Sequence, residues 1–105
     1  IGSDKISNQL HIINEQTNNK YIKFNLDYTY NDENDPNQFY YRSDHFHFVK
    51  NNIPAIFYFS GTHEDYHQPS DTAEKILYET YKKRVKLIFH TAWGLANREE
   101  RIKLK

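Results

Sequence analysis

Five consecutive residues, His63-Glu64-Asp65-Tyr66-His67, match the pattern H-E-x-x-H. In zincin proteases this pattern lies on a regular helix, where both histidines bind one zinc ion and the glutamate acts as general base. The flanking residues do not favour a helix here. Gly61 precedes the pattern, and Pro69 follows so closely that Gln68 is expected to be extended. We therefore predict that the pattern lies in a loop and is not a zincin site.

The loop from Gly61 to Thr72 is nevertheless rich in groups that do chemistry, because it carries imidazoles, carboxylates and a phenol. It follows the apolar run Ile53–Phe59. Ligands of open α/β sheets bind beyond the carboxyl ends of buried strands, which favours a site in this loop. A plain polar connection would have the same composition. The residues alone leave both interpretations open.

The elements that must position this loop alternate between helical and extended patterns. Apolar residues recur at i, i+4 and i+7 where we expect helices, and at every second position where we expect an exposed strand. The expected elements are a helix over residues 4–19 capped by Ser3, a strand over 22–30, a short helix over 43–50 capped by Ser43, a buried strand over 53–59, and a long helix capped by Asp71. This order predicts one layered α/β domain over residues 1–105.

The last helix is expected to be amphipathic, because apolar residues recur along one face. Those residues are Leu77, Tyr81, Val85, Ile88, Ala92 and Leu95. The basic run Lys82–Lys86 is expected to form a solvated face.

The overall composition excludes several classes of protein and site. Lys plus Arg and Asp plus Glu both number 14, so the chain lacks the basic excess that nucleic acids or anionic membranes attract. No apolar run approaches the roughly 20 residues of a membrane span. Cysteine is absent, which excludes disulfides and thiolate metal sites. Because the chain begins at Ile1 without an initiator methionine, we expect it to be part of a longer protein.

Three segments occur in a specific order: Arg42-Ser43-Asp44-His45, the apolar run Ile53–Phe59, and Asp65–Thr72. Together they resemble the C-terminal part of the secreted di-zinc aminopeptidases, metallopeptidase family twenty-eight, to which glutaminyl cyclases and the transferrin-receptor ectodomain also belong. The resemblance covers nearly the whole chain and is strongest over residues 39–76. It implies a three-layer α/β/α zinc-exopeptidase fold with a mixed sheet, of which this chain would hold only the C-terminal fragment.

The resemblance also implies roles for residues of the loop. His67 would be a ligand in a centre of two zinc ions, and Tyr66 would donate a hydrogen bond to the tetrahedral intermediate. Asp65 would support them, whereas His63 and Glu64 would have no catalytic part. The residues alone leave open the alternative that Tyr66 is a packed ring.

Arg42 and Asp44 are implied to lie near the metal centre and to orient ligands or substrate without binding zinc. A first-turn helix charge remains the alternative for Asp44. His45 and His47 are two residues apart, so on a helix they cannot chelate one ion. We expect both of them, like His11 and His90, to be ordinary packing or surface residues.

The parent protein implied by the resemblance is a secreted or periplasmic enzyme that hydrolyses N-terminal residues from peptide substrates. Its other zinc ligands and its general base would lie outside this chain. Because catalytic zinc needs about three protein ligands, we predict that the isolated chain is inactive and binds zinc weakly. A non-catalytic binding module and a glutaminyl cyclase are the alternative functions. An exposed sheet edge is expected to favour self-association of the fragment.

Overall fold

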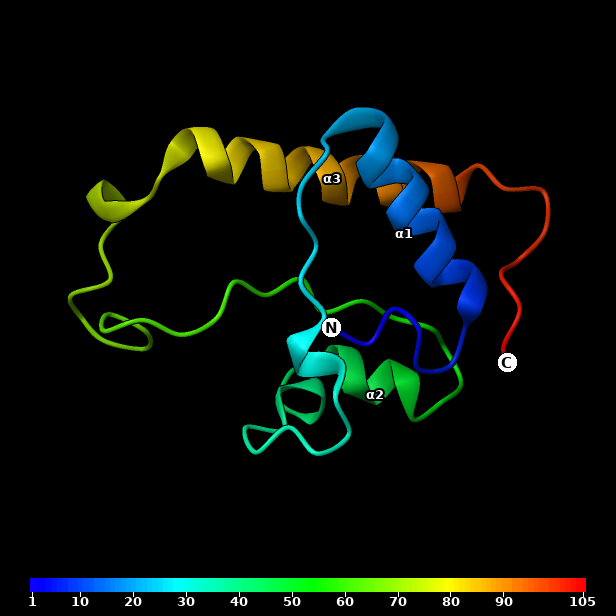
Figure 1. Ribbon diagram of the computed structural model, residues 1–105, viewed down its shortest axis with the longest axis horizontal. Coiled ribbons are helices and arrows are strands. Elements are labelled where there is room, and N and C mark those ends of the chain that lie inside the picture. Colours follow the sequence, from blue (N-terminus) through cyan, green and yellow to red (C-terminus); the bar gives the residue numbers. More distant parts are fainter.

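Three α-helices dominate the computed structural model, which describes residues 1–105 (Figure 1). Helix α1 packs across helix α3, and the short helix α2 lies on the other side of the extended chain (Figure 1). The helices span Asn8–Tyr21 (α1), His45–Val49 (α2) and Tyr78–Ala96 (α3), with 3-10 helices at Thr29–Asn31 (η1), Phe39–Tyr41 (η2) and Ala73–Lys75 (η3). None of the helices has the length and hydrophobicity that a membrane span requires.

The chain contains no β-strand, so the expected three-layer α/β/α fold with a mixed sheet is wrong for this structure. The first expected strand is extended and keeps its alternation: Phe24 and Leu26 are half-buried, and Asn25 between them is exposed. Its backbone is tied by a side chain instead of a neighbouring strand. The Asn18 amide donates to the Phe24 carbonyl at 2.8 Å and accepts from its N–H at 2.9 Å.

The second expected strand, residues 53–59, is also extended and unpaired over most of its length. In its middle, the Phe57 N–H donates to the Ile1 carbonyl at 2.9 Å, and the Ile1 amino group donates to the Phe57 carbonyl at 2.7 Å. The backbone N–H groups of its neighbours Ile56 and Tyr58 have no partner. A strand needs hydrogen bonds from neighbouring strands, and no other segment of these 105 residues supplies them.

The first helix is confirmed, although it begins later than expected. Its N-cap is Ser7, whose hydroxyl accepts from the Leu10 N–H at 3.3 Å and donates to the Lys103 carbonyl at 2.7 Å. Ser3, the expected cap, lies buried before the helix, and its hydroxyl bonds to Nδ1 of His11 at 2.9 Å. Both serine side chains therefore form hydrogen bonds, but only Ser7 caps helix α1.

The other two helices also form, with different starts. Helix α2 begins at His45 without a side-chain cap, so the expected Ser43 cap is wrong. It is followed by Asn52 in the left-handed region at φ 59°, a conformation that asparagine tolerates at the end of a helix. Helix α3 begins at Tyr78, not at Asp71, because the backbone at Ile76 is extended and interrupts the helix after η3.

Helix α3 does not pack on α1 through its most apolar face. Leu87 and Thr91 are buried, each with 3% exposed surface, and the His90 ring stacks on Tyr21 of α1 at 3.9 Å. The apolar face expected for α3 does not pack on α1, and its residues Tyr81 and Val85 are 56% and 45% exposed. An apolar stripe therefore remains uncovered along α3.

Candidate functional site

The loop after residue 60 contains turns and no α-helix. The Tyr66 N–H donates to the His63 carbonyl at 3.0 Å, and the Gln68 N–H donates to the Asp65 carbonyl at 2.9 Å. His67 lies in the left-handed region at φ 57°. The two histidines of the H-E-x-x-H pattern therefore do not share a helical face. The prediction that this pattern is not a zincin helix is confirmed.

Tyr66 and His67 present their rings together. The ring centroids are 4.0 Å apart and the planes are 15° from parallel. His67 is exposed and Tyr66 is half-buried. The side-chain hydrogen bonds of the loop involve neither the His67 imidazole nor the Tyr66 hydroxyl. Both groups are thus free to bind something outside the chain.

The Asp65 carboxylate turns back into the loop. One of its oxygens accepts from the Ser70 hydroxyl at 2.6 Å and from Nζ of Lys75 at 2.9 Å. The Ser70 hydrogen bond, followed by that of Lys75, holds the pKa of Asp65 below its ordinary value. The Asp65 N–H donates to Nδ1 of His63 at 3.2 Å, so His63 is engaged within the turn.

Arg42 and Asp44 lie before α2 and make no hydrogen bond or ion pair with the loop. The Arg42 guanidinium lies 5.3 Å from the centre of the Phe39 ring and donates to the Asn37 carbonyl at 3.4 Å. Asp44 is exposed and occupies the N-cap position of α2 without a capping hydrogen bond. The structure does not bring either side chain to His67.

A chain of aromatic rings nevertheless connects the two sequence motifs. Phe39, beneath Arg42, lies 4.6 Å from Phe59, and Phe59 lies 6.3 Å from Tyr66 in an edge-on arrangement. Such ring pairs are favourable at centroid distances of about 4.5–7 Å. The high aromatic content, 16% of the chain, was the sequence signal for this packing, although it does not say which rings meet.

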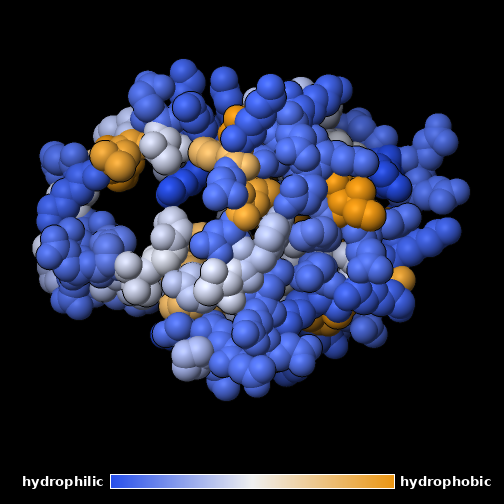
Figure 2. All heavy atoms as spheres, viewed as in Figure 1, coloured by the Kyte–Doolittle hydropathy of each residue, from blue (hydrophilic) through white to orange (hydrophobic).

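A polar hollow of about 470 Å³ separates the loop from the start of α3. Figure 2 shows an opening between these two parts of the molecule. The loop side is lined by His63, Glu64 and Asp71, and the helix side by Tyr81 and Arg84. His67 does not line this hollow. The exposed imidazole and the hollow are therefore separate features of the same loop.

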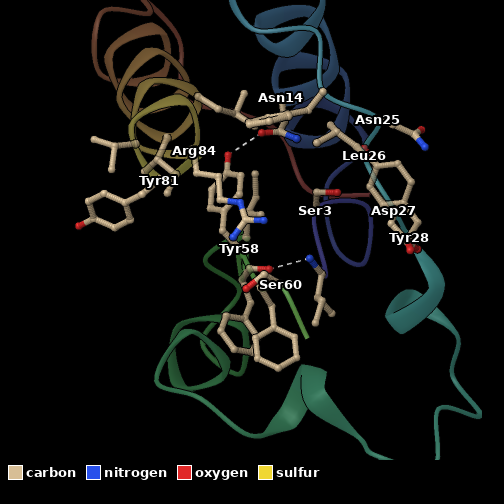
Figure 3. Close-up of a pocket in the computed structure, with 18 residues that line it drawn as sticks. Ser3, Asn14, Asn25, Leu26, Asp27, Tyr28, Tyr58, Ser60, Tyr81 and Arg84 are labelled. Carbon is tan, nitrogen blue, oxygen red and sulfur yellow. Dashed lines mark hydrogen bonds between the residues drawn. The ribbon is translucent and has the colours of Figure 1, made fainter. Parts of the chain in front are cut away.

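A second, more apolar hollow of about 450 Å³ lies between α3 and the two extended segments, and 12 of its 18 lining residues are hydrophobic. Tyr58 points across it and donates to the side-chain oxygen of Asn14 at 2.5 Å (Figure 3). Asn14 is 3% exposed, so this hydrogen bond satisfies a buried acceptor. The hollow lies where the extended segments lack backbone partners.

His45 has a more unusual environment than the expected packing or surface role. Its ring stacks on Phe57 at 4.8 Å and lies 5.7 Å from the Tyr40 ring. Neither of its ring nitrogens nor the buried Tyr40 hydroxyl has a hydrogen-bond partner. Burial lowers the pKa of His45, and the nearby Tyr40 backbone offsets this only in part. The sequence contains no signal for this cluster beyond the closeness of Tyr40 and His45.

The residues of this chain do not assemble a metal site by themselves. No three His, Asp or Glu side chains come together in a group that could hold an ion. The free imidazole of His67 suits one ligand position, whereas catalytic zinc needs about three protein ligands. The donor set is therefore insufficient for zinc within these 105 residues.

Comparison with known proteins gives one match. The family model described as peptidase family M28 matches residues 4–92, a stretch that includes Arg42, Asp44 and the whole Asp65–Lys75 segment. Neither the curated proteins nor the solved structures give a significant match.

Proposed function

Because this chain belongs to peptidase family M28, we propose that it is the C-terminal portion of a zinc-dependent aminopeptidase, which removes N-terminal residues from peptides. The family is one of peptide hydrolases and is generally zinc-dependent, which implies peptide substrates. One observation in the structure carries the proposal. His67 and Tyr66 stack within the matched region and leave an imidazole and a phenolic hydroxyl free side by side.

Each residue of the motifs then has a proposed role. His67 supplies one ligand to a centre of two zinc ions, as a neutral imidazole. The Tyr66 hydroxyl donates a hydrogen bond to the oxygen that becomes negative when the peptide carbonyl is attacked. Asp65 holds the loop, while Arg42 and Asp44 lie around the substrate and orient it. The aromatic contacts from Phe39 to Tyr66 support the idea that both motifs serve one site.

The surface of the molecule supports its being part of a larger domain. The exposed area is 7994 Å², compared with about 6,200 Å² for a folded monomer of 12.7 kDa. The radius of gyration is 14.8 Å, compared with about 12.9 Å for a compact chain of this length. Residues 55–59 are half-buried and most of their backbone groups are unpaired, which is unfavourable unless another segment or water pairs with these groups.

The isolated chain is proposed to be inactive and to bind zinc weakly, because it brings no three ligands together. Calorimetric titration of the 105-residue chain with zinc is expected to show no tight binding at a fixed stoichiometry. Tight binding that disappears in His67→Ala would contradict this proposal, as would any peptidase turnover by the isolated chain.

The enzyme function is tested in the protein that carries these residues within its whole peptidase domain. We expect hydrolysis of leucine anilide, and its loss in His67→Ala. Tyr66→Phe should lower kcat by about 100-fold with little change in KM, because it removes one donor to the oxyanion. Tyr41→Phe is the matched control, since Tyr41 is 51% exposed and has no assigned role.

The same assay separates the alternative functions. Cyclisation of a peptide with N-terminal glutamine, without hydrolysis of leucine anilide, would identify a glutaminyl cyclase. Peptide binding without any turnover would identify a binding module, and either result would overturn the aminopeptidase proposal.

A further inference from the structure

The loop of residues 61–72 is joined to the rest of the chain by few side-chain contacts. Its backbone hydrogen bonds are local turns, such as Tyr66 to His63 and Asp71 to Gln68. The Tyr66 ring meets Phe59 edge-on at 6.3 Å. At its C-terminal end the loop is joined to η3 by the Lys75 N–H, which donates to the Thr72 carbonyl at 3.1 Å, and by the ion pair between Asp65 and Lys75. The Asp65 carboxylate therefore links the turn around residues 63–70 to η3 through a side chain.

The Asp65 carboxylate receives two donors on one oxygen, from Ser70 at 2.6 Å and from Lys75 at 2.9 Å. We call these three residues the loop clamp. The Asp65 side chain is 16% exposed, although its partner Lys75 is 52% exposed. Because Lys75 is open to solvent, the ion pair contributes little to overall stability. The clamp is therefore expected to act on the geometry of the loop more than on the stability of the chain.

The clamp encloses a backbone position that needs support. His67 lies between Asp65 and Ser70, and its φ of 57° is in the left-handed region that residues other than glycine seldom adopt. Such a conformation persists when the surrounding structure holds it in place. The Asp65 carbonyl accepts from the Gln68 N–H at 2.9 Å, so fixing Asp65 also fixes the turn around His67.

We propose that Ser70 and Lys75 are positioning residues, which hold the Asp65 carboxylate and thereby keep His67 in its left-handed conformation and stacked on Tyr66. The value of this positioning rests on the proposed function of His67 as a zinc ligand. The structural part of the proposal requires no metal, because it concerns only the direction in which the imidazole is presented.

The test is NMR spectroscopy of the 105-residue chain without metal. In the wild type, the Tyr66 ring at 4.0 Å should shift the His67 ring protons upfield. This shift should shrink towards the random-coil position in Lys75→Met and in Ser70→Ala. Exchange of the Gln68 amide proton should become about 5- to 10-fold faster, because the turn opens more often. Lys75→Arg should keep both the upfield shift of the His67 ring protons and the wild-type exchange rate of the Gln68 amide proton, since it keeps the cation.

Two controls separate positioning from a general loss of structure. Lys82→Met removes the same charge from α3, where Lys82 forms no ion pair, and should leave the His67 protons unchanged. The stacked rings of Tyr21 and His90, which join α1 to α3, should keep their shifts in every variant. Changes in both ring pairs together would show unfolding and would contradict a positioning role.

The proposal is overturned if Lys75→Met and Ser70→Ala both leave the His67 ring protons and the Gln68 exchange rate unchanged. That failure would not affect the aminopeptidase proposal, which depends on turnover and on His67→Ala. Conversely, a peptidase assay without turnover would leave the effect of Ser70 and Lys75 on the loop measurable. The two proposals can therefore fail separately.

Discussion

At the scale of single residues, the environments of His67 and His45 assign different chemistry to the same side chain. His67 is exposed on a turn, and its ring nitrogens are free to bind an ion or a substrate. His45 is packed between Phe57 and Tyr40, and its ring nitrogens are shielded but unbonded. Burial disfavours the charged imidazolium, so His45 is suited to remaining neutral. We therefore expect the same burial to make the chain sensitive to acid.

Stability is predicted to fall as the pH drops below about 6.5, the ordinary pKa of histidine. Burial sets the folded pKa of His45 below that value, so the unfolded chain takes up the proton first. The contribution of neutral His45 is complete above pH 6.5 and is lost as the pH falls towards the folded pKa. Asp44 beside the ring opposes this loss, and the Ile1 ammonium increases it.

The measurement is the urea midpoint between pH 7.5 and pH 5. The fall in midpoint should be smaller in His45→Phe, which keeps the stacking on Phe57 and removes the proton site. His47→Gln on the same helix should behave like the wild type, because His47 is exposed. An identical pH dependence in His45→Phe would show that other groups cause the acid sensitivity.

At the scale of elements, the helices follow from local signals, but their ends do not. Ser3 precedes the apolar periodicity that begins at Ile6, whereas Ser7 lies within it, so the spacing favours Ser3 as the cap. The choice is made by a distant contact, because the Ser7 hydroxyl also reaches the Lys103 carbonyl. Similarly, Asp71 has the capping spacing of a helix start, but the extended backbone at Ile76 delays α3 to Tyr78.

The Ser7 cap is predicted to matter for stability. Ser7→Ala should lower the free energy of unfolding by about 1–2 kcal/mol, because it removes the cap and leaves the Lys103 carbonyl without its donor. Ser43→Ala is the matched control, since Ser43 is exposed and provides no cap, and it should change stability by less than about 0.5 kcal/mol. Equal effects in urea denaturation would contradict the role of Ser7.

The strands and the site were predictable only in part. The period-two pattern around Phe24 correctly predicts which side chains are half-buried and which are exposed, because alternation is a local property of an extended chain. Sheet formation is not local, since it depends on neighbours that these residues do not provide. In the loop, Pro69 correctly excluded a zincin helix. The bond from Lys75 to Asp65 could not be foreseen, because it depends on side-chain directions ten residues apart.

At the scale of the whole molecule, the uncovered surface is the dominant feature. The exposed area exceeds that of a compact monomer by about 1,800 Å². For comparison, a standard protein interface buries about 800 Å² per partner. The apolar stripe of α3 is one continuous part of it. Phe89 and Trp93 lie beside this stripe on the same helix, where they stack at 5.9 Å while remaining 56% and 61% exposed. Large exposed apolar surfaces of this kind favour association.

We therefore predict that the isolated 105-residue chain self-associates through the stripe of α3. Sedimentation velocity should show an average mass that rises above 12.7 kDa over micromolar concentrations, with a blue shift of Trp93 emission as its ring becomes buried. Phe89→Glu should hold the chain as a monomer and remove the blue shift, because a carboxylate in the apolar surface beside the stripe would be costly to bury.

Lys83→Gln is the control for this prediction, because it alters the net charge by the same single unit on the same helix. It should leave self-association intact if apolar contact is the cause, since Lys83 lies outside the stripe. Dissociation by Lys83→Gln as well would point to charge instead. The prediction is contradicted if the wild-type chain stays monomeric up to about 100 μM with unchanged Trp93 emission. A weak dimer would be populated at that concentration, so this result would mean that the stripe does not bind a second copy.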